Sequence, residues 1–79
     1  MSMIDYITEA RAIRDELGNN LSEWRVRIDE SIAVGSTGTE ILMAIRWNFA
    51  ELLKAEPMLP VELASRVKDY IMEANKKLK

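Results

Sequence analysis

The 79-residue sequence contains neither cysteine nor histidine, and these two absences exclude much of the chemistry that proteins perform. Without cysteine the chain has no disulfide, no thiolate nucleophile and no thiolate metal ligand. Without histidine it lacks the side chain that most often acts as a general base, binds a metal or activates a nucleophile. A carboxylate di-iron bundle is excluded too, because it needs Glu-x-x-His on two helices. We therefore predict that the protein is not an enzyme and holds no cofactor and no metal.

Carboxylates remain as candidates for catalysis or for binding Mg²⁺. Three pairs stand close together in the sequence: Asp5 and Glu9, Asp15 and Glu16, and Asp29 and Glu30. All three pairs fall on predicted polar helix faces with basic residues nearby, a pattern typical of a solvated surface. A carboxylate-based metal-binding protein is therefore kept only as an alternative.

The chain also lacks a strong excess of charge of either sign. Its 11 basic and 13 acidic residues give a net charge of −2, which disfavours nucleic acid and anionic membranes as partners. The N-terminal residues show no basic segment followed by an apolar run, and the longest apolar run is too short to cross a membrane. Because the absence of cysteine also suits a reducing compartment, we expect a soluble cytoplasmic protein.

Glycine and proline are scarce, and their positions divide the chain. No segment alternates polar and apolar residues, and no Asn-Gly or Asp-Gly turn occurs, so no strand is predicted. Four segments with helical periodicity are separated by short connections, which favour antiparallel neighbours. The predicted helices span residues 3–17, 21–34, 38–55 and 60–78. We predict an all-α fold, with residues 1–79 forming one compact four-helix domain resembling an antiparallel bundle.

Capping signals predict where these helices begin and end. Three pairs have capping-box spacing: Ser2 with Asp5, Asn20 with Glu23, and Thr37 with Glu40. Met1 and Tyr6 occupy the positions of a hydrophobic staple. Gly18 suits the left-handed position after the first helix, and Pro60 suits the first position of the fourth helix.

Apolar residues recur at helical spacing in each segment and predict the core. The predicted core residues are Met3, Tyr6, Ile7, Ala10, Ile13 and Leu17; Leu21, Trp24, Ile28 and Ile32; Ile41, Leu42, Ile45, Phe49, Leu52 and Leu53; and Leu63, Ala64, Val67, Tyr70, Ile71, Ala74 and Leu78.

The predicted helix over residues 38–55 is apolar on a second side, and this is the strongest functional signal. Met43, Trp47 and Ala50 lie nearly opposite its main stripe and next to Lys54. This side either packs under another helix of the same domain or binds another chain. Methionine and tryptophan are enriched at protein interfaces, so we expect these four residues to bind a partner. The predicted function is a protein-interaction module, either a homo-oligomer or an inhibitor or adaptor of another protein. Val26 and Val34 are weaker signals of the same kind.

The glycine- and hydroxyl-rich segment of residues 35–39 precedes a helix start, as phosphate-binding loops do. It has no P-loop lysine and no preceding strand, and Glu40 places a negative charge at the same helix end. A capping role is therefore favoured over an anion site.

A helix-turn-helix formed by the second and third predicted helices is the alternative function, as a DNA-binding regulator. Its recognition helix should present a basic face to the groove. Arg46, Asn48 and Lys54 instead point to different sides of the helix, which disfavours DNA as a partner.

Overall fold

The computed structural model of the protein describes the backbone of residues 3–79 and the side chains of residues 5–79. Within residues 3–79 there are four α-helices, one short 3-10 turn and no strand. The elements are α1 (Met3–Glu16), η1 (Asn19–Leu21), α2 (Ser22–Val34), α3 (Gly38–Ala55) and α4 (Val61–Lys77). The predicted all-α, four-helix fold is confirmed, and each predicted helix end lies within one residue of the observed end.

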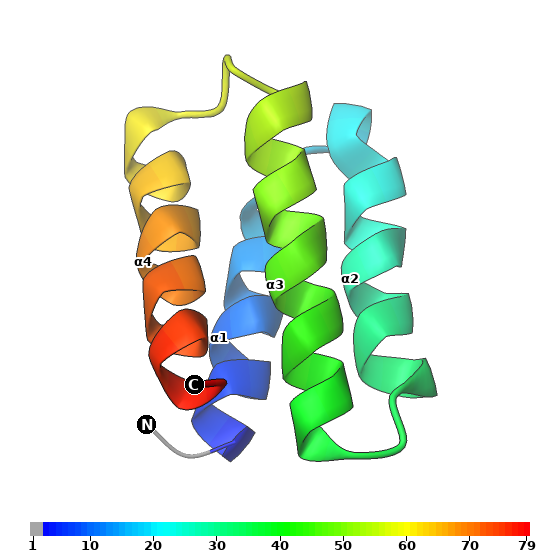
Figure 1. Cartoon of the computed structure of the whole chain (residues 1–79). Helices are drawn as coiled ribbons and strands as arrows, with labels where there is room; N and C mark the ends of the chain where they lie inside the picture. The colour runs from blue at the N-terminus through cyan, green and yellow to red at the C-terminus, as the bar shows by residue number, and fades with distance from the viewer. Residues whose placement is uncertain (1–2) are drawn as a thin grey trace.

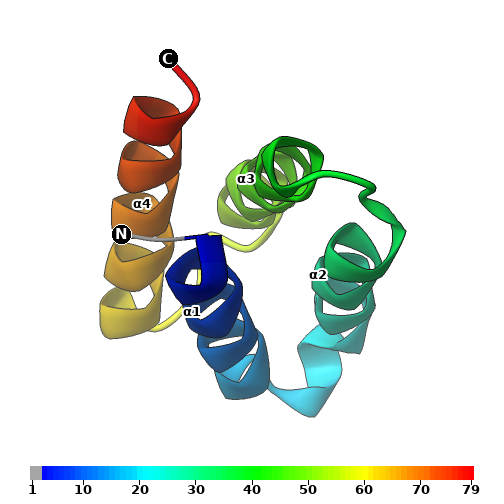
Figure 2. The same ribbon diagram turned by 90° about the horizontal axis from the view of Figure 1, so that it is seen from below.

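The helices form an up-down bundle in which each runs antiparallel to the one before it (Figure 1). Helix α1 packs between α2 and α4, and α3 lies across the bundle from α1 (Figure 2). Helices α1 and α3 each contact all three other helices, and α3 packs most extensively against α2 and α4. The short connections explain this topology, because a few residues can join only the neighbouring ends of adjacent helices.

All of the buried apolar side chains except Leu59 come from the predicted apolar stripes. The buried apolar side chains are Tyr6, Ala10, Ile13, Leu17, Trp24, Ile28, Leu42, Ile45, Phe49, Leu52, Leu59, Leu63, Val67, Tyr70 and Ala74. The side chain of Met3 lies outside the described residues, and the predicted core residues that are only partly buried are Ile7, Leu21, Ile32, Ile41, Leu53, Ala64, Ile71 and Leu78. Leu59 was not predicted, because it lies in the connection between α3 and α4, where helical periodicity does not apply. Phe49 is fully buried, and its ring meets that of Tyr70 edge to face with the centroids 5.1 Å apart. The core therefore centres on the inner side of α3.

Three predictions about caps are wrong. Gly18 has φ of −71° and not a left-handed conformation, because the chain passes directly into the 3-10 turn. Asn20 lies inside this turn, so Leu21 is the N-cap residue of α2 and no side chain caps that helix. Pro60 is the N-cap of α4 and not its first residue. The predicted Ser2–Asp5 capping box and Met1–Tyr6 staple each include a residue outside the described part of the chain.

Candidate functional site

The outer side of α3 carries two large apolar side chains at the surface. Trp47 is 59% exposed and Met43 is 47% exposed, whereas Ile45 and Phe49 on the inner side are fully buried. No other helix of the described chain covers Trp47 or Met43. The first of the two possibilities raised by the sequence, burial within the domain, is therefore not the one that the structure adopts.

The four residues predicted to bind a partner lie along one side of α3, and we call them the Trp47 face: Met43, Trp47, Ala50 and Lys54. Their spacing of three or four residues stacks them on successive turns, over a length of about 17 Å. Ala50 is half-buried and Lys54 is exposed. The Trp47 face thus combines an apolar centre with a cationic end.

A shallow hollow of about 380 Å³ lies beside Trp47, between α2 and α3. Its lining residues are Arg27, Glu30, Ser31, Val34, Ala44, Trp47 and Asn48. Val34, at the end of α2, is 79% exposed and adds apolar surface to that of Trp47. The sequence signal at Val34 was weak, because only the packing of α2 against α3 brings the two residues to one hollow.

A partly buried hydrogen-bond network lies at the floor of this hollow. The Asn48 amide donates to Ser31 Oγ of α2 at 2.8 Å and to the carbonyl of Ala44, one turn earlier in α3, at 3.1 Å. Ser31 Oγ in turn donates to the carbonyl of Arg27 at 2.8 Å. Ser31 is 4% exposed, so its hydroxyl needs these partners. The network holds α2 and α3 in one relative position, and the hollow beside Trp47 is therefore preformed.

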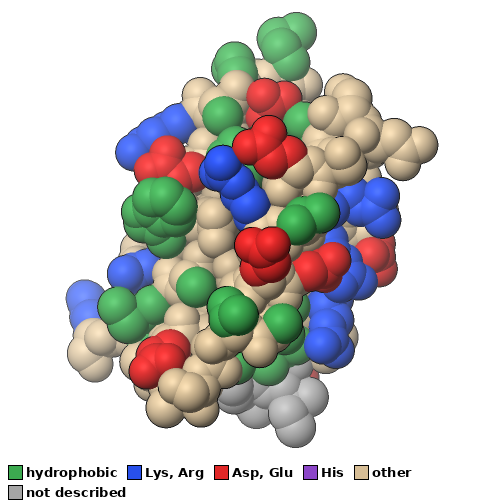
Figure 3. All heavy atoms as spheres, turned by 90° about the vertical axis from the view of Figure 1, so that its right-hand side faces the viewer, with side chains coloured by type: hydrophobic (Ala, Val, Ile, Leu, Met, Phe, Trp, Pro, Cys, Tyr) green, Lys and Arg blue, Asp and Glu red, His purple; other side chains and the backbone are tan. Residues whose placement is uncertain are grey.

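Charges of both signs surround the hydrophobic side chains on the neighbouring surface. Figure 3 shows the side of the molecule that lies to the right in Figure 1, with hydrophobic, acidic and basic side chains interspersed. Arg27 pairs with Glu23 at 3.0 Å, and its guanidinium lies 4.5 Å from the centre of the Trp24 ring. Mixed polarity around an apolar centre is typical of protein interfaces.

The candidate helix-turn-helix does not have the geometry of that motif. Helices α2 and α3 pack side by side as antiparallel neighbours, whereas the motif joins two helices at about 90–120° (Figures 1 and 2). Arg46 donates a hydrogen bond to Asn75 of α4 at 2.9 Å, and Asn48 belongs to the hollow floor. Lys54 lies on the Trp47 face, so the three polar residues of α3 do not form one surface that could enter a DNA groove.

Three of the six acidic residues considered as metal ligands pair with arginines of other helices, and Asp15 pairs with Arg14 of its own helix. Arg66 of α4 pairs with Glu9 at 3.0 Å and also with Glu16, both on α1. Arg14 of α1 pairs with Asp29 of α2. Among the described residues, no group of three or more potential ligands is arranged to hold a metal ion. These contacts indicate that the acids link the outer surfaces of the helices.

The capping box in front of α3 is confirmed in one half and wrong in the other. Thr37 Oγ1 accepts a hydrogen bond from the Glu40 amide at 3.1 Å, as predicted. The Glu40 carboxylate, however, accepts from the hydroxyl and amide of Ser36, at 2.8 and 3.2 Å, and not from Thr37. These hydrogen bonds, chiefly that of the hydroxyl, lower the pKa of Glu40. A carboxylate therefore occupies donors that a phosphate would need, which disfavours an anion site.

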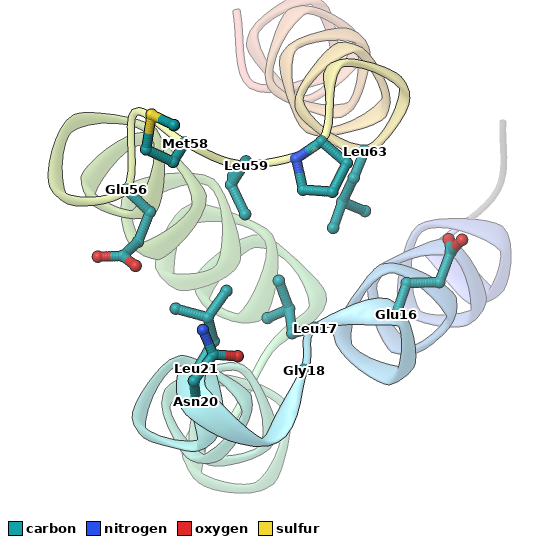
Figure 4. Close-up of a pocket in the computed structure, with 10 residues that line it drawn as sticks. Glu16, Leu17, Gly18, Asn20, Leu21, Glu56, Met58, Leu59 and Leu63 are labelled. Atoms are coloured by element: carbon teal, nitrogen blue, oxygen red, sulfur yellow. The ribbon is translucent and has the colours of Figure 1, made fainter.

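A second hollow, of about 310 Å³, lies at the end of the bundle where the α1–α2 and α3–α4 connections meet. Its inner wall consists of four leucines that point toward one another: Leu17, Leu21, Leu59 and Leu63 (Figure 4). Glu16, Glu56 and Met58 line it, but their side chains extend away from the leucines in Figure 4. This hollow is an incompletely filled end of the core, and the polar side chains in its lining are those of Glu16, Asn20 and Glu56.

None of the helices in residues 3–79 combines the length and the apolar character that crossing a membrane requires. No protein-family model matches the chain, and neither the curated proteins nor the solved structures include a similar one. The candidate site is the Trp47 face with its shallow hollow, where large apolar side chains are exposed.

Proposed function

We propose that the protein is a small helical interaction module that binds a protein chain through the Trp47 face and the adjoining hollow. The observation that supports this proposal is the exposure of Trp47 beside Met43, on the outer side of α3. Tryptophan is among the commonest hot-spot residues, because one side chain buries a large apolar area and its indole nitrogen can still donate a hydrogen bond. The absence of cysteine agrees with a cytoplasmic location, and we place the interaction there.

The Trp47 face lies on a helix that is held on its inner side by buried side chains and is hydrogen-bonded to its neighbour, unlike a set of scattered apolar residues. The inner side of α3 is anchored by the buried Ile45 and Phe49, and the Ser31–Asn48 hydrogen bond holds α2 alongside. A partner would therefore meet a surface that needs little ordering on binding, which lowers the entropic cost of association. Other exposed apolar residues, such as Met58 and Met72, lie on other elements, and single residues of this kind need no special explanation.

Substituting Trp47 by glutamate tests the proposal. Trp47→Glu should leave the domain folded but weaken partner binding by about thirtyfold or more, the loss expected for a hot spot of at least 2 kcal/mol. Met72→Glu is the matched control, because Met72 is 57% exposed in the middle of α4 and undergoes the same change of charge. The wild-type chain, immobilised, would be used to isolate binding proteins from its native host, and each variant would then be titrated against them. Equal binding by both variants would contradict the proposal.

A further inference from the structure

We propose that the chain that binds the Trp47 face is a second copy of the same protein, with the two α3 helices antiparallel about a two-fold axis at Trp47. This inference rests on the proposed function, since it uses the same surface, but it specifies the partner and the orientation. It is carried by the order of charges along the exposed side of α3.

Trp47 lies midway between two opposite charges on this side of the helix. Glu40 precedes it by seven residues and Lys54 follows it by seven, and all three side chains are exposed. Seven residues make about two helical turns, so the three lie close to one line, with the Cα atoms of Glu40 and Lys54 each about 10 Å along the helix from that of Trp47. Glu51 lies on the edge of the same side, four residues after Trp47 and partly buried, and in the reversed arrangement it faces Met43 of the other copy. The outer side of α3 therefore has Glu40 at its N-terminal end, Met43 and Trp47 at its centre, and Lys54 beside Glu51 at its C-terminal end.

Such an arrangement is complementary to itself when one copy is reversed. With Trp47 on the axis, Glu40 of each copy lies opposite Lys54 of the other copy, and the apolar centres meet. Symmetry forms this ion pair twice, as expected for an interface in which both copies use the same surface. A parallel arrangement would instead place Glu40 against Glu40 and Lys54 against Lys54, which is unfavourable.

Both charges can take part in such pairs. Among the ion pairs formed by the described residues, none uses Lys54. The hydrogen bonds from Ser36 are accepted by one carboxylate oxygen of Glu40, Oε2, which leaves the other oxygen for a second cation. The Ser36 hydrogen bonds also favour the ionised form of Glu40. An exposed carboxylate and an exposed ammonium group are thus presented at the two ends of one helix face.

The centre of the face offers apolar surface for the second tryptophan. The hollow beside Trp47 has Ala44 and Val34 in its lining and about 380 Å³ of space. In the reversed arrangement, the Trp47 ring of each copy lies at the axis, within reach of the hollow of the other copy. One helix face per copy is a small contact, so we expect a weak dimer that exchanges with monomer and has a Kd in the range of about 1–100 μM.

Sedimentation of charge-reversed variants tests the orientation directly. Lys54→Glu and Glu40→Lys each replace two attractive pairs by two repulsive ones, and each should raise the dimer Kd by about tenfold. An equimolar mixture of these two variants should form a heterodimer about as tightly as the wild type, because every facing pair is again opposite in charge. Lys68→Glu, which reverses an exposed lysine on α4, is the control for net charge and should dimerise like the wild type.

The mixture also separates pairing from folding. Glu40→Lys removes the contact with Ser36 and can lower the stability of α3, which thermal melts of each variant would reveal. Mixing cannot repair a lost cap, so recovery of association in the mixture reports the intermolecular pairs. A wild-type chain that stays monomeric up to about 1 mM, single variants that dimerise like the wild type, or a mixture no tighter than its components would each overturn the inference.

Failure of this inference can be told from failure of the proposed function. If the wild-type chain is monomeric but captures a different protein in a manner that depends on Trp47, the proposed function stands and the second copy is wrong. If Trp47→Glu dimerises as tightly as the wild type and also retains its other binding proteins, both proposals are wrong.

Discussion

The Tyr70 hydroxyl on α4 donates a hydrogen bond to the backbone carbonyl of Tyr6 on α1, at 3.1 Å. The Tyr6 hydroxyl in turn donates to the backbone carbonyl of Glu73, also at 3.1 Å, so two bonds cross between the first and last helices. The two rings meet edge to face with their centroids 5.8 Å apart. Burial raises the pKa of the Tyr70 phenol, which further favours its neutral, hydrogen-donating form. These contacts join the two terminal helices of the bundle.

Removing the Tyr70 hydroxyl should weaken this link while leaving the aromatic packing in place. We expect Tyr70→Phe to lower the free energy of unfolding by about 1 kcal/mol, because the Tyr6 carbonyl loses a buried partner and the ring still packs against Phe49. Urea denaturation followed by circular dichroism would measure the change. A variant as stable as the wild type would show that this hydrogen bond adds nothing to the packing of α1 against α4.

The two aromatic residues on opposite sides of α3 should respond very differently to substitution. Phe49→Ala should lower the free energy of unfolding by about 3–5 kcal/mol, which threatens the folding of so small a domain, because it opens a cavity at a fully buried position. Trp47→Glu should change it by only about 0.5 kcal/mol, since the exposed site lets water solvate the charge. Thermal and chemical denaturation would measure both. Equal destabilisation would mean that Trp47 is packed inside the domain, and the interface proposal would lose its main support.

Loss of the N-cap of α3 should lower the stability of the domain, and added anions should not restore that stability. Thr37→Ala removes the acceptor for the Glu40 amide and should lower the free energy of unfolding by about 1 kcal/mol. Phosphate or ATP should not reverse this loss, because the Glu40 carboxylate already occupies the Ser36 donors. Thermal melts across a range of ligand concentrations would check the prediction, and saturable stabilisation by either ligand would restore the anion-site hypothesis.

The contact between Glu40 and Ser36 should make part of the stability depend on pH. The pKa of Glu40 lies below its ordinary value of 4.5 in the folded chain, so the ionised form is favoured by folding. This contribution is present above pH 4.5 and is lost as the pH falls through the lower folded-state pKa. Glu40→Gln should therefore melt at a lower temperature than the wild type at pH 7, and the difference should shrink toward pH 3 or below. A difference that is constant over this range would exclude the ionised carboxylate as its cause.

The sequence by itself determined the helices and the inward side of each one. Phe49 and Trp47 are two residues apart and lie on opposite sides of α3 in any regular α-helix, so the periodicity alone predicted that Phe49 faces the core and Trp47 does not. Whether another helix covers Trp47 was left open by the sequence and was decided by the packing of the helices. The start of α3 at Gly38 and its end at Ala55 likewise followed from the Thr37 cap and from Pro57, which both act through their immediate neighbours.

Only the tertiary structure decided the contacts between helices and the conformations of the connections that join them. The bond between Ser31 and Asn48, and the hollow that Trp47 shares with Val34, require the rotation and offset of α2 against α3. Burial of Leu59 and the extended conformation of Gly18 were decided in connections, where no helical period applies. The physical reason is the range of the interactions: hydrogen bonds along one helix are set by nearby residues, whereas packing between helices is set by the combined shape of side chains distant in the sequence.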